Sequence, residues 1–171
     1  MRSVNKLQVL IGLTALVAGF VLYLVHRSPD TYFISAFGLA HHPYSWNPPF
    51  LATIGGCLPS LLHVFAFSLL LGGLLGCRKT GCLIICCAWL FTNVLFELGQ
   101  RYASSVSQIV PAWFEGSFVL ENAKSFFLTG TFDTLDILAS FAGAAAAYAV
   151  LVITMKNKGK GECHAGRDCP G

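Results

Sequence analysis

The sequence predicts an all-α protein that crosses a membrane several times. Hydrophobic residues make up 55% of the 171 residues and charged residues only 11%, whereas roughly a quarter of the residues in a soluble domain are charged. The apolar runs are long enough for the hydrocarbon core of a bilayer, which takes about 20 residues of helix. Spans in lipid are helices or closed barrels, because unpaired backbone groups find no partner there. Continuous rather than alternating apolar runs favour helices.

Four apolar runs predict four transmembrane helices, at about 7–25, 51–76, 82–100 and 135–155. The first run follows Arg2 and Lys6, as a cleavable signal does. Its apolar part exceeds the usual signal length of about 7 to 15 residues, so we interpret it as a retained anchor. The spans form one domain over residues 1–155, and residues 156–171 form a basic, cysteine-containing tail that we expect to be disordered.

Lysine and arginine in short flanking loops favour the cytoplasmic side. The basic residues before the first span, between the second and third, and after the fourth fall on one side: Arg2, Lys6, Arg78, Lys79, Lys156, Lys158, Lys160 and Arg167. We therefore predict a multi-pass protein of the inner (cytoplasmic) membrane with both termini in the cytoplasm. These residues explain the net charge of +3. They lack the clustered face that binds phosphates, so nucleic acid is not an expected partner.

Two segments on the predicted outer side are rich in aromatic residues. In the first, Asp30 is a candidate N-cap for a short helix over 31–39 that lies on the membrane surface. Its adjacent His41 and His42 point apart in an irregular segment, so solvation is favoured over metal binding. The second segment, 101–133, favours an interfacial helix or a re-entrant hairpin, the alternative being that its aromatic residues only anchor the protein in the membrane.

Four polar residues interrupt the apolar spans: His63, Glu97, Gln100 and Asp136. In the predicted topology all four fall in the outer half of the membrane, with Glu97 about one helical turn below the surface. A charged residue at the centre of a span costs about 2.5 to 3.5 kcal/mol, so such residues usually face protein or a wet cavity. We therefore expect a polar pocket in the outer leaflet. The alternatives are structural hydrogen bonds between helices, a satisfied core histidine, and capping of the last helix by Asp133 and Asp136.

Two further patterns concern packing. Small residues recur at every fourth position of the last span: Ala139, Gly143 and Ala147. This small-xxx-small pattern lets helices approach closely and predicts a central position for the last helix, with Asp136 near Glu97. In the second span, two glycines and Pro59 predict a loosened or broken helix just above His63.

The motifs "FELGQ" and "GTFDTLDILASFAGAAAAY" follow a histidine-containing helix in this order. The combination resembles the VanZ-like family of small bacterial membrane proteins, whose pattern joins such a helix to an E-x-x-Q helix end and a segment like R-T-x-D-x-x-D-x-x-x-N-x-x-G. The resemblance covers about residues 58–150, with matches at His63, Glu97, Gln100, Thr131, Asp133, Asp136 and Gly143. Gly130 stands where a basic residue is expected, and Ser140 where asparagine is usual. The resemblance implies a role at the cell envelope, since the namesake is associated with glycopeptide antibiotic resistance.

The seven cysteines are odd in number, which argues against a complete set of disulfides. Cys86 and Cys87 of the third span are expected to be apolar fillers. The predicted topology places four thiols in the reducing cytoplasm: Cys77, Cys82, Cys163 and Cys169. A zinc or iron-sulfur site formed by these four with His164 is an alternative to a disordered tail, although neither pair has the spacing of a zinc knuckle.

Two functional hypotheses follow. In the first, the pocket binds a lipid-linked, glycopeptide-like or amine-bearing ligand through its carboxylates, with further contacts from Gln100, Thr131, Asp133 and Ser140. In the second, the protein is a membrane-embedded hydrolase or transferase for a lipid-linked substrate. Glu97, Asp136 and His63 are then its catalytic acid and base, or hold a divalent metal ion. Membrane lipid is an expected partner in both cases, and a transporter is disfavoured because four helices without repeats offer little for alternating access.

Overall fold

The computed structural model describes residues 4–26, 49–109, 127 and 130–165. Five helices lie in these ranges: α1 (Lys6–His26), α3 (Pro49–Leu75), α4 (Lys79–Arg101), α5 (Ala103–Ile109) and α7 (Thr134–Ala165). The described ranges contain no strand, so the predicted all-α class is confirmed for them. The predicted surface helix over 31–39, His41, His42 and residues 110–126 of the second outer segment lie outside the described residues.

Three helices have the length and apolar composition of membrane spans: Gly55–Leu75 within α3, Lys79–Arg101 of α4 and Thr134–Met155 within α7. In α1 the apolar segment Lys6–Leu22 is shorter. Large apolar side chains are exposed on all four helices, among them Val17, Phe20, Leu74, Ile84, Phe91 and Leu138. Exposed apolar surface of this extent is typical of contact with a membrane. Apart from the end of α7, the helix ends lie within three residues of the predicted span boundaries.

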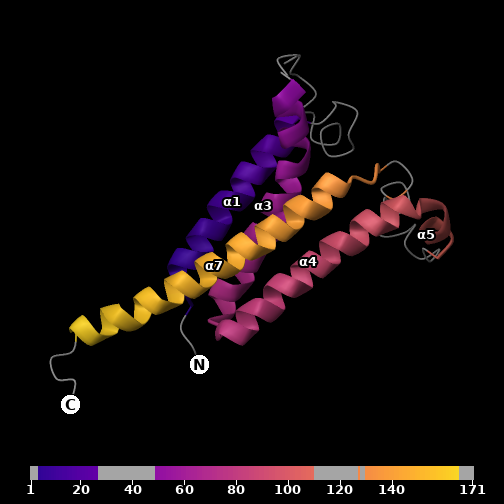
Figure 1. Cartoon of the computed structure of the whole chain (residues 1–171). Helices are drawn as coiled ribbons and strands as arrows, with labels where there is room; N and C mark the ends of the chain where they lie inside the picture. Colours follow the sequence, from indigo (N-terminus) through magenta and orange to yellow (C-terminus); the bar gives the residue numbers. More distant parts are fainter. Residues whose placement is uncertain (1–3, 27–48, 110–126, 128–129, 166–171) are drawn as a thin grey trace, which may run out of the picture.

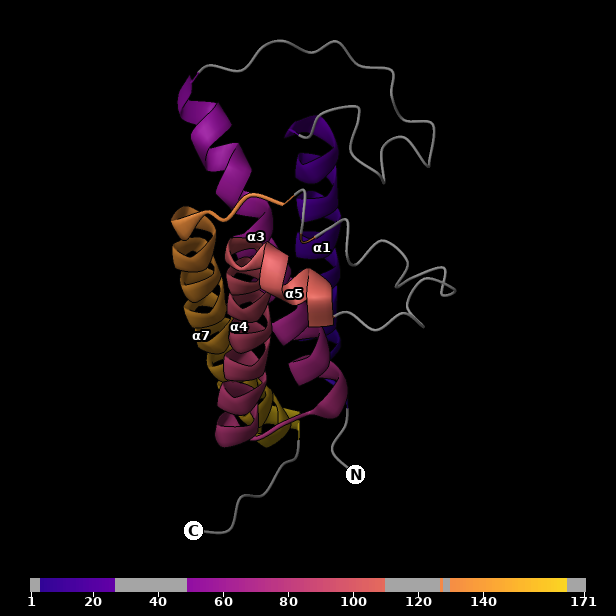
Figure 2. The ribbon, with the colours of Figure 1, turned by 90° about the vertical axis from the view of Figure 1, so that its right-hand side faces the viewer.

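The four long helices run side by side, and α3 occupies the centre of the bundle (Figure 1). α3 packs most extensively against α1 and α7, while α4 packs against α7 and α3. The start of α1, the turn between α3 and α4, and the end of α7 lie at one end of the bundle, and α5 lies at the other (Figures 1 and 2). The turn contains Gly76 with a positive φ of 55°, a conformation that glycine adopts without strain.

Close helix packing depends on Gly143 of α7. A Cβ atom built on Gly143 would collide with the backbone carbonyl oxygen of Leu61 on α3. Ala147, one turn further along α7, has no exposed surface. The predicted small-residue face therefore packs against the backbone of α3, and α7 contacts each of the other three long helices.

The predicted break in the second span is wrong, because α3 is a continuous helix from Pro49 to Leu75 with Pro59 inside it. Proline removes one backbone hydrogen bond, but membrane helices tolerate it when neighbouring groups adjust. Here α1 packs along α3, so the segment around Pro59 is supported from the side. A Cβ on the nearby Gly56 meets nothing within 4 Å, so this glycine is not required for close approach.

A buried polar contact joins the start of α1 to α7, and the sequence did not predict it. Gln8 of α1 is 2% exposed and donates from Nε2 to the Leu151 carbonyl oxygen at 3.2 Å and to Thr154 Oγ1 at 2.7 Å. The backbone N–H of Asn5 donates to the Gly73 carbonyl oxygen of α3 at 2.9 Å. Both contacts fix the start of α1 to its neighbours.

α7 continues as helix to Ala165, although the sequence predicts a disordered tail from residue 156. Helix propagation adds one hydrogen bond per residue, whereas nucleation is the unfavourable step. A long apolar span therefore extends readily into the following residues.

Candidate functional site

The carboxyl-terminal end of α4 contacts the beginning of α7 through Glu97. Its side chain is only 8% exposed, and Oε2 accepts a hydrogen bond of 3.3 Å from the backbone N–H of Asp133. Asp133 Oδ1 in turn accepts from the backbone N–H of Leu135 at 2.8 Å, which is the geometry of an N-cap. The Glu97 carboxylate therefore lies at the positive end of the α7 dipole. The alternative interpretation of Asp133 as a helix cap is confirmed.

Aromatic contacts hold the segment before α7 against α4. Phe127 stacks on Phe96 with ring centroids 6.0 Å apart, and a Cβ on Gly99 would meet the Phe127 ring at 2.6 Å. The Arg101 guanidinium lies 5.0 Å from the centroid of the Phe132 ring, within cation–π distance. These contacts keep the start of α7 beside Glu97.

Asp136, in the first turn of α7, joins that helix to α3. Its Oδ1 accepts a hydrogen bond of 3.0 Å from the Ser60 hydroxyl. Ser60 precedes His63 by about one helical turn. It was not among the predicted site residues, because a serine in an apolar span carries little signal until its partner across the interface is known.

Ser140 and Asn93 form the next contact toward the centre of the bundle. The Ser140 hydroxyl has no exposed surface; it accepts from Asn93 Nδ2 at 2.6 Å and donates to the Asp136 carbonyl oxygen at 2.7 Å. Asn93 was also missed by the sequence analysis, although a signal exists: it lies four residues before Glu97 and so shares its helix face. Polar contacts thus continue from Glu97 and Asp136 into the interface between α4 and α7.

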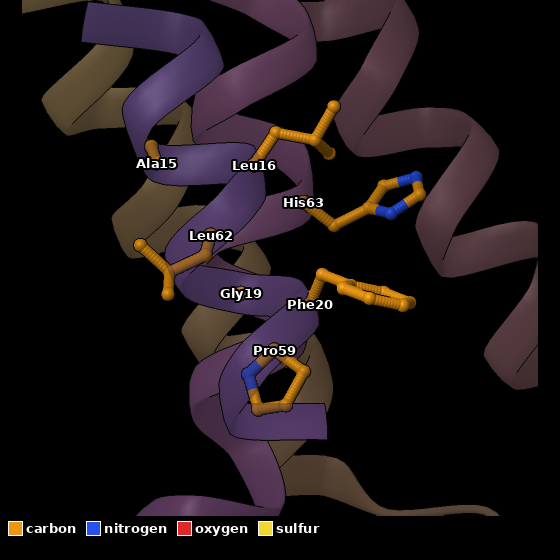
Figure 3. A pocket seen from close by; sticks show the side chains of 7 residues that line it. All are labelled: Ala15, Leu16, Gly19, Phe20, Pro59, Leu62 and His63. Carbon is orange, nitrogen blue, oxygen red and sulfur yellow. The ribbon is translucent and has the colours of Figure 1, made fainter. Parts of the chain in front are cut away.

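His63 has different neighbours from the carboxylates. Its ring lies 4.6 Å from the Phe67 ring and 6.0 Å from the Trp89 ring, measured between centroids, and Phe67 stacks on Trp89 at 4.7 Å. It also lines a groove between α1 and α3 (Figure 3). The predicted pocket joined His63 to the carboxylates, but the contact from α3 to Asp136 is made by Ser60.

The remaining predicted contact residues lie near this end of the bundle. Gln100 is half-buried in the last turn of α4, and Thr131 is exposed just before α7. Among the residues that the structure describes, no three His, Cys, Asp or Glu side chains converge in a way that holds a metal ion. The divalent ion considered for the pocket therefore has no supporting geometry there.

No disulfide joins the cysteines that the structure describes: Cys57, Cys77, Cys82, Cys86 and Cys87. Cys82 and Cys86 belong to the buried core, with exposures of 1% and 2%. Cys86 thus fills apolar space as expected, while Cys87 is exposed on α4. The side chains of Cys163, His164 and Cys169 lie outside the described part of the chain, so the proposed zinc or iron-sulfur site stays untested.

Comparisons with known proteins found no match. No family model, no curated protein and no solved structure is significantly similar to this chain.

Proposed function

We propose that the chain crosses the bacterial inner membrane four times, and that α1 spans the membrane in addition to α3, α4 and α7. α1 has 21 residues, and at 1.5 Å per residue its length of about 31 Å matches the hydrocarbon core. An even number of crossings agrees with the start of α1 and the end of α7 lying at the same end of the bundle (Figure 2). The basic flanking residues assign that end to the cytoplasm. Glu97 and Asp136 then face the outside.

The function that this arrangement supports best is binding of an amine-bearing lipid or lipid-linked ligand in the outer leaflet. The central observation is that Glu97 and Asp136, from two adjoining helices, are both held by hydrogen bonds at one end of the bundle. A carboxylate offers about four acceptor positions. An ammonium group supplies three donors and forms charge-assisted bonds, which are stronger than neutral ones.

The resemblance to the VanZ-like pattern supports an envelope role. That pattern has asparagine where this chain has Ser140, and here Asn93 of the neighbouring helix donates its amide to the Ser140 hydroxyl. An amide is therefore present at this position of the interface, although it comes from α4. A glycopeptide-like ligand would suit the same carboxylates, since glycopeptide antibiotics carry amino groups.

A lipid-binding assay tests this proposal. In nanodiscs with equal amounts of phosphatidylethanolamine and phosphatidylglycerol, native mass spectrometry should show preferential retention of phosphatidylethanolamine. Asp136→Asn and Glu97→Gln keep the side-chain shape but remove the charge, and each should reduce the preference by about tenfold, the order expected for one charge-assisted bond. Thr92→Ala is the control, because the Thr92 hydroxyl bonds to the Ala88 carbonyl oxygen of its own helix and the variant keeps both carboxylates and the Ser60 contact. Equal retention of the two lipids by the native protein would refute the proposal for this ligand.

The alternative is a hydrolase or transferase, and the hydrogen bond from Ser60 to Asp136 is the observation that favours it. A hydroxyl becomes a nucleophile when an adjacent base accepts its proton. Ser60→Ala distinguishes the two functions, because it removes the nucleophile and leaves the charge. An enzyme would lose turnover with this variant and keep ligand affinity.

A further inference from the structure

A groove of about 190 Å³ lies between α1 and α3, and all but one of the side chains that line it are apolar. Ala15, Gly19 and Phe20 contribute from α1, and Leu62 and His63 from α3 (Figure 3). The single polar group is the imidazole of His63. Any ligand of this groove must therefore be mainly apolar and offer one hydrogen-bonding atom to the ring.

The depth of His63 limits the kind of ligand further. His63 lies twelve residues before the end of α3 at Leu75, which is about 18 Å along the helix axis. This is close to the middle of a hydrocarbon core about 30 Å thick. A polar group at this depth is unfavourable unless it is hydrogen-bonded. A charged lipid headgroup is equally unfavourable there, so the ligand must be uncharged.

Aromatic rings surround the imidazole. Phe67 and Trp89 stack on each other and border His63 on one side, at centroid distances of 4.6 and 6.0 Å from its ring. Phe20 is 55% exposed, and its ring projects from α1 to the same side as the imidazole (Figure 3). Of these three residues Phe20 lines the groove, and a flat π system packs well against its ring, because offset and edge contacts between aromatic groups are favourable.

We propose that this groove binds the ring of an isoprenoid quinone. Such a ring is flat, uncharged and apolar apart from its carbonyl oxygens, and it resides within the bilayer. One carbonyl oxygen accepts a hydrogen bond from the His63 N–H while the ring packs against Phe20, and the isoprenoid tail extends into lipid. This site does not involve Glu97 or Asp136 and does not depend on the proposed function of those residues.

Quenching of Trp89 fluorescence by decylubiquinone tests the proposal. In the full-length protein with Trp46→Phe and Trp113→Phe, Trp89 is the only tryptophan, and quinone binding should quench it saturably. His63→Phe should weaken binding by about tenfold, as expected for the loss of one hydrogen bond. His63→Gln, which retains an N–H donor, should restore part of the affinity.

Two matched substitutions on α1 test the location. Ala15→Leu fills the groove and should also abolish saturable quenching, whereas Ala18→Leu lies on the exposed surface outside the groove and should leave it unchanged. These variants retain His63, so they test the site even if His63→Phe does not fold. The proposal is overturned if the native protein shows no saturable quenching, or if Ala15→Leu has no effect. It is also overturned if decylbenzene, which lacks carbonyl oxygens, competes with decylubiquinone equally well.

Discussion

The Ser60 hydroxyl on α3 donates a hydrogen bond of 3.0 Å to Oδ1 of Asp136 on α7. This contact fixes the orientation of the Asp136 carboxylate and the register of the two helices. A Cβ on Gly143, about two turns along α7, would collide with the Leu61 carbonyl of the same partner helix. Carboxylate placement and close helix packing are thus two properties of one interface.

Removing the Ser60 hydroxyl should destabilise the bundle. Ser60→Ala should lower the free energy of unfolding by about 0.6 to 1.7 kcal/mol, the range for hydrogen bonds between membrane helices. The measurement is denaturation in mixed detergent micelles. Thr92→Ala is the control, because the Thr92 hydroxyl bonds only within its own helix, to the Ala88 carbonyl oxygen. Equal losses for both variants would contradict a specific role for the contact between α3 and α7.

The contact between Asn93 and Ser140 should appear as an energetic coupling. The single variants Asn93→Ala and Ser140→Ala and the double variant form a thermodynamic cycle. We expect a coupling energy of about 0.6 kcal/mol and at most about 1.7 kcal/mol. Additive effects of the two substitutions would show that the 2.6 Å contact does not contribute to stability.

Gly143 should tolerate no side chain. Gly143→Ala places a Cβ against the Leu61 backbone, which cannot move as a flexible side chain does. Overpacking of this kind costs about 1 to 3 kcal/mol, and the thermal unfolding midpoint in detergent should fall accordingly. Gly56→Ala is the matched control, since a Cβ at Gly56 meets nothing within 4 Å. Equal unfolding temperatures for the two variants would contradict the close packing of Gly143 against α3.

Gln8 should be required for attachment of the start of α1 to α7. Gln8→Ala removes the hydrogen bonds to Leu151 and Thr154 and leaves a cavity, at a cost of about 2 to 4 kcal/mol. Protease cleavage near the start of α1 should become faster. Thr14→Ala on the same helix removes only a hydroxyl bonded to the Leu10 carbonyl oxygen and should change little. Unchanged proteolysis of Gln8→Ala would argue against this attachment.

The sequence was sufficient to predict where the long helices lie in the chain. Continuous apolar runs give the positions of α1, α3 and α4 to within three residues, because length and hydrophobicity depend only on local sequence. The small-residue pattern around Gly143 predicted a close helix contact, and α7 makes one with α3.

Which helix faces meet could not be predicted in the same way. His63 and Ser60 are one turn apart on α3, and the rotation of that helix decides which of them faces Asp136. Single-helix periodicity carries little information on rotation when a helix is apolar on all sides. For the same reason the sequence did not predict the contacts of Gln8 and Asn93, whose partners lie on another helix, α7. Pro59 failed as a helix breaker because packing by neighbouring helices overrides its local effect.

The central claim, that the carboxylate end of the bundle faces the outside of the membrane, is tested most directly by thiol labelling in intact cells. In a variant without native cysteines, Thr131→Cys places a thiol on the exposed segment beside Asp133. Lys79→Cys places one at the exposed turn between α3 and α4, at the opposite end. We predict that a membrane-impermeant maleimide labels Thr131→Cys in intact cells and Lys79→Cys only after permeabilisation. The reverse pattern would contradict the account, because Glu97 and Asp136 would then face the cytoplasm.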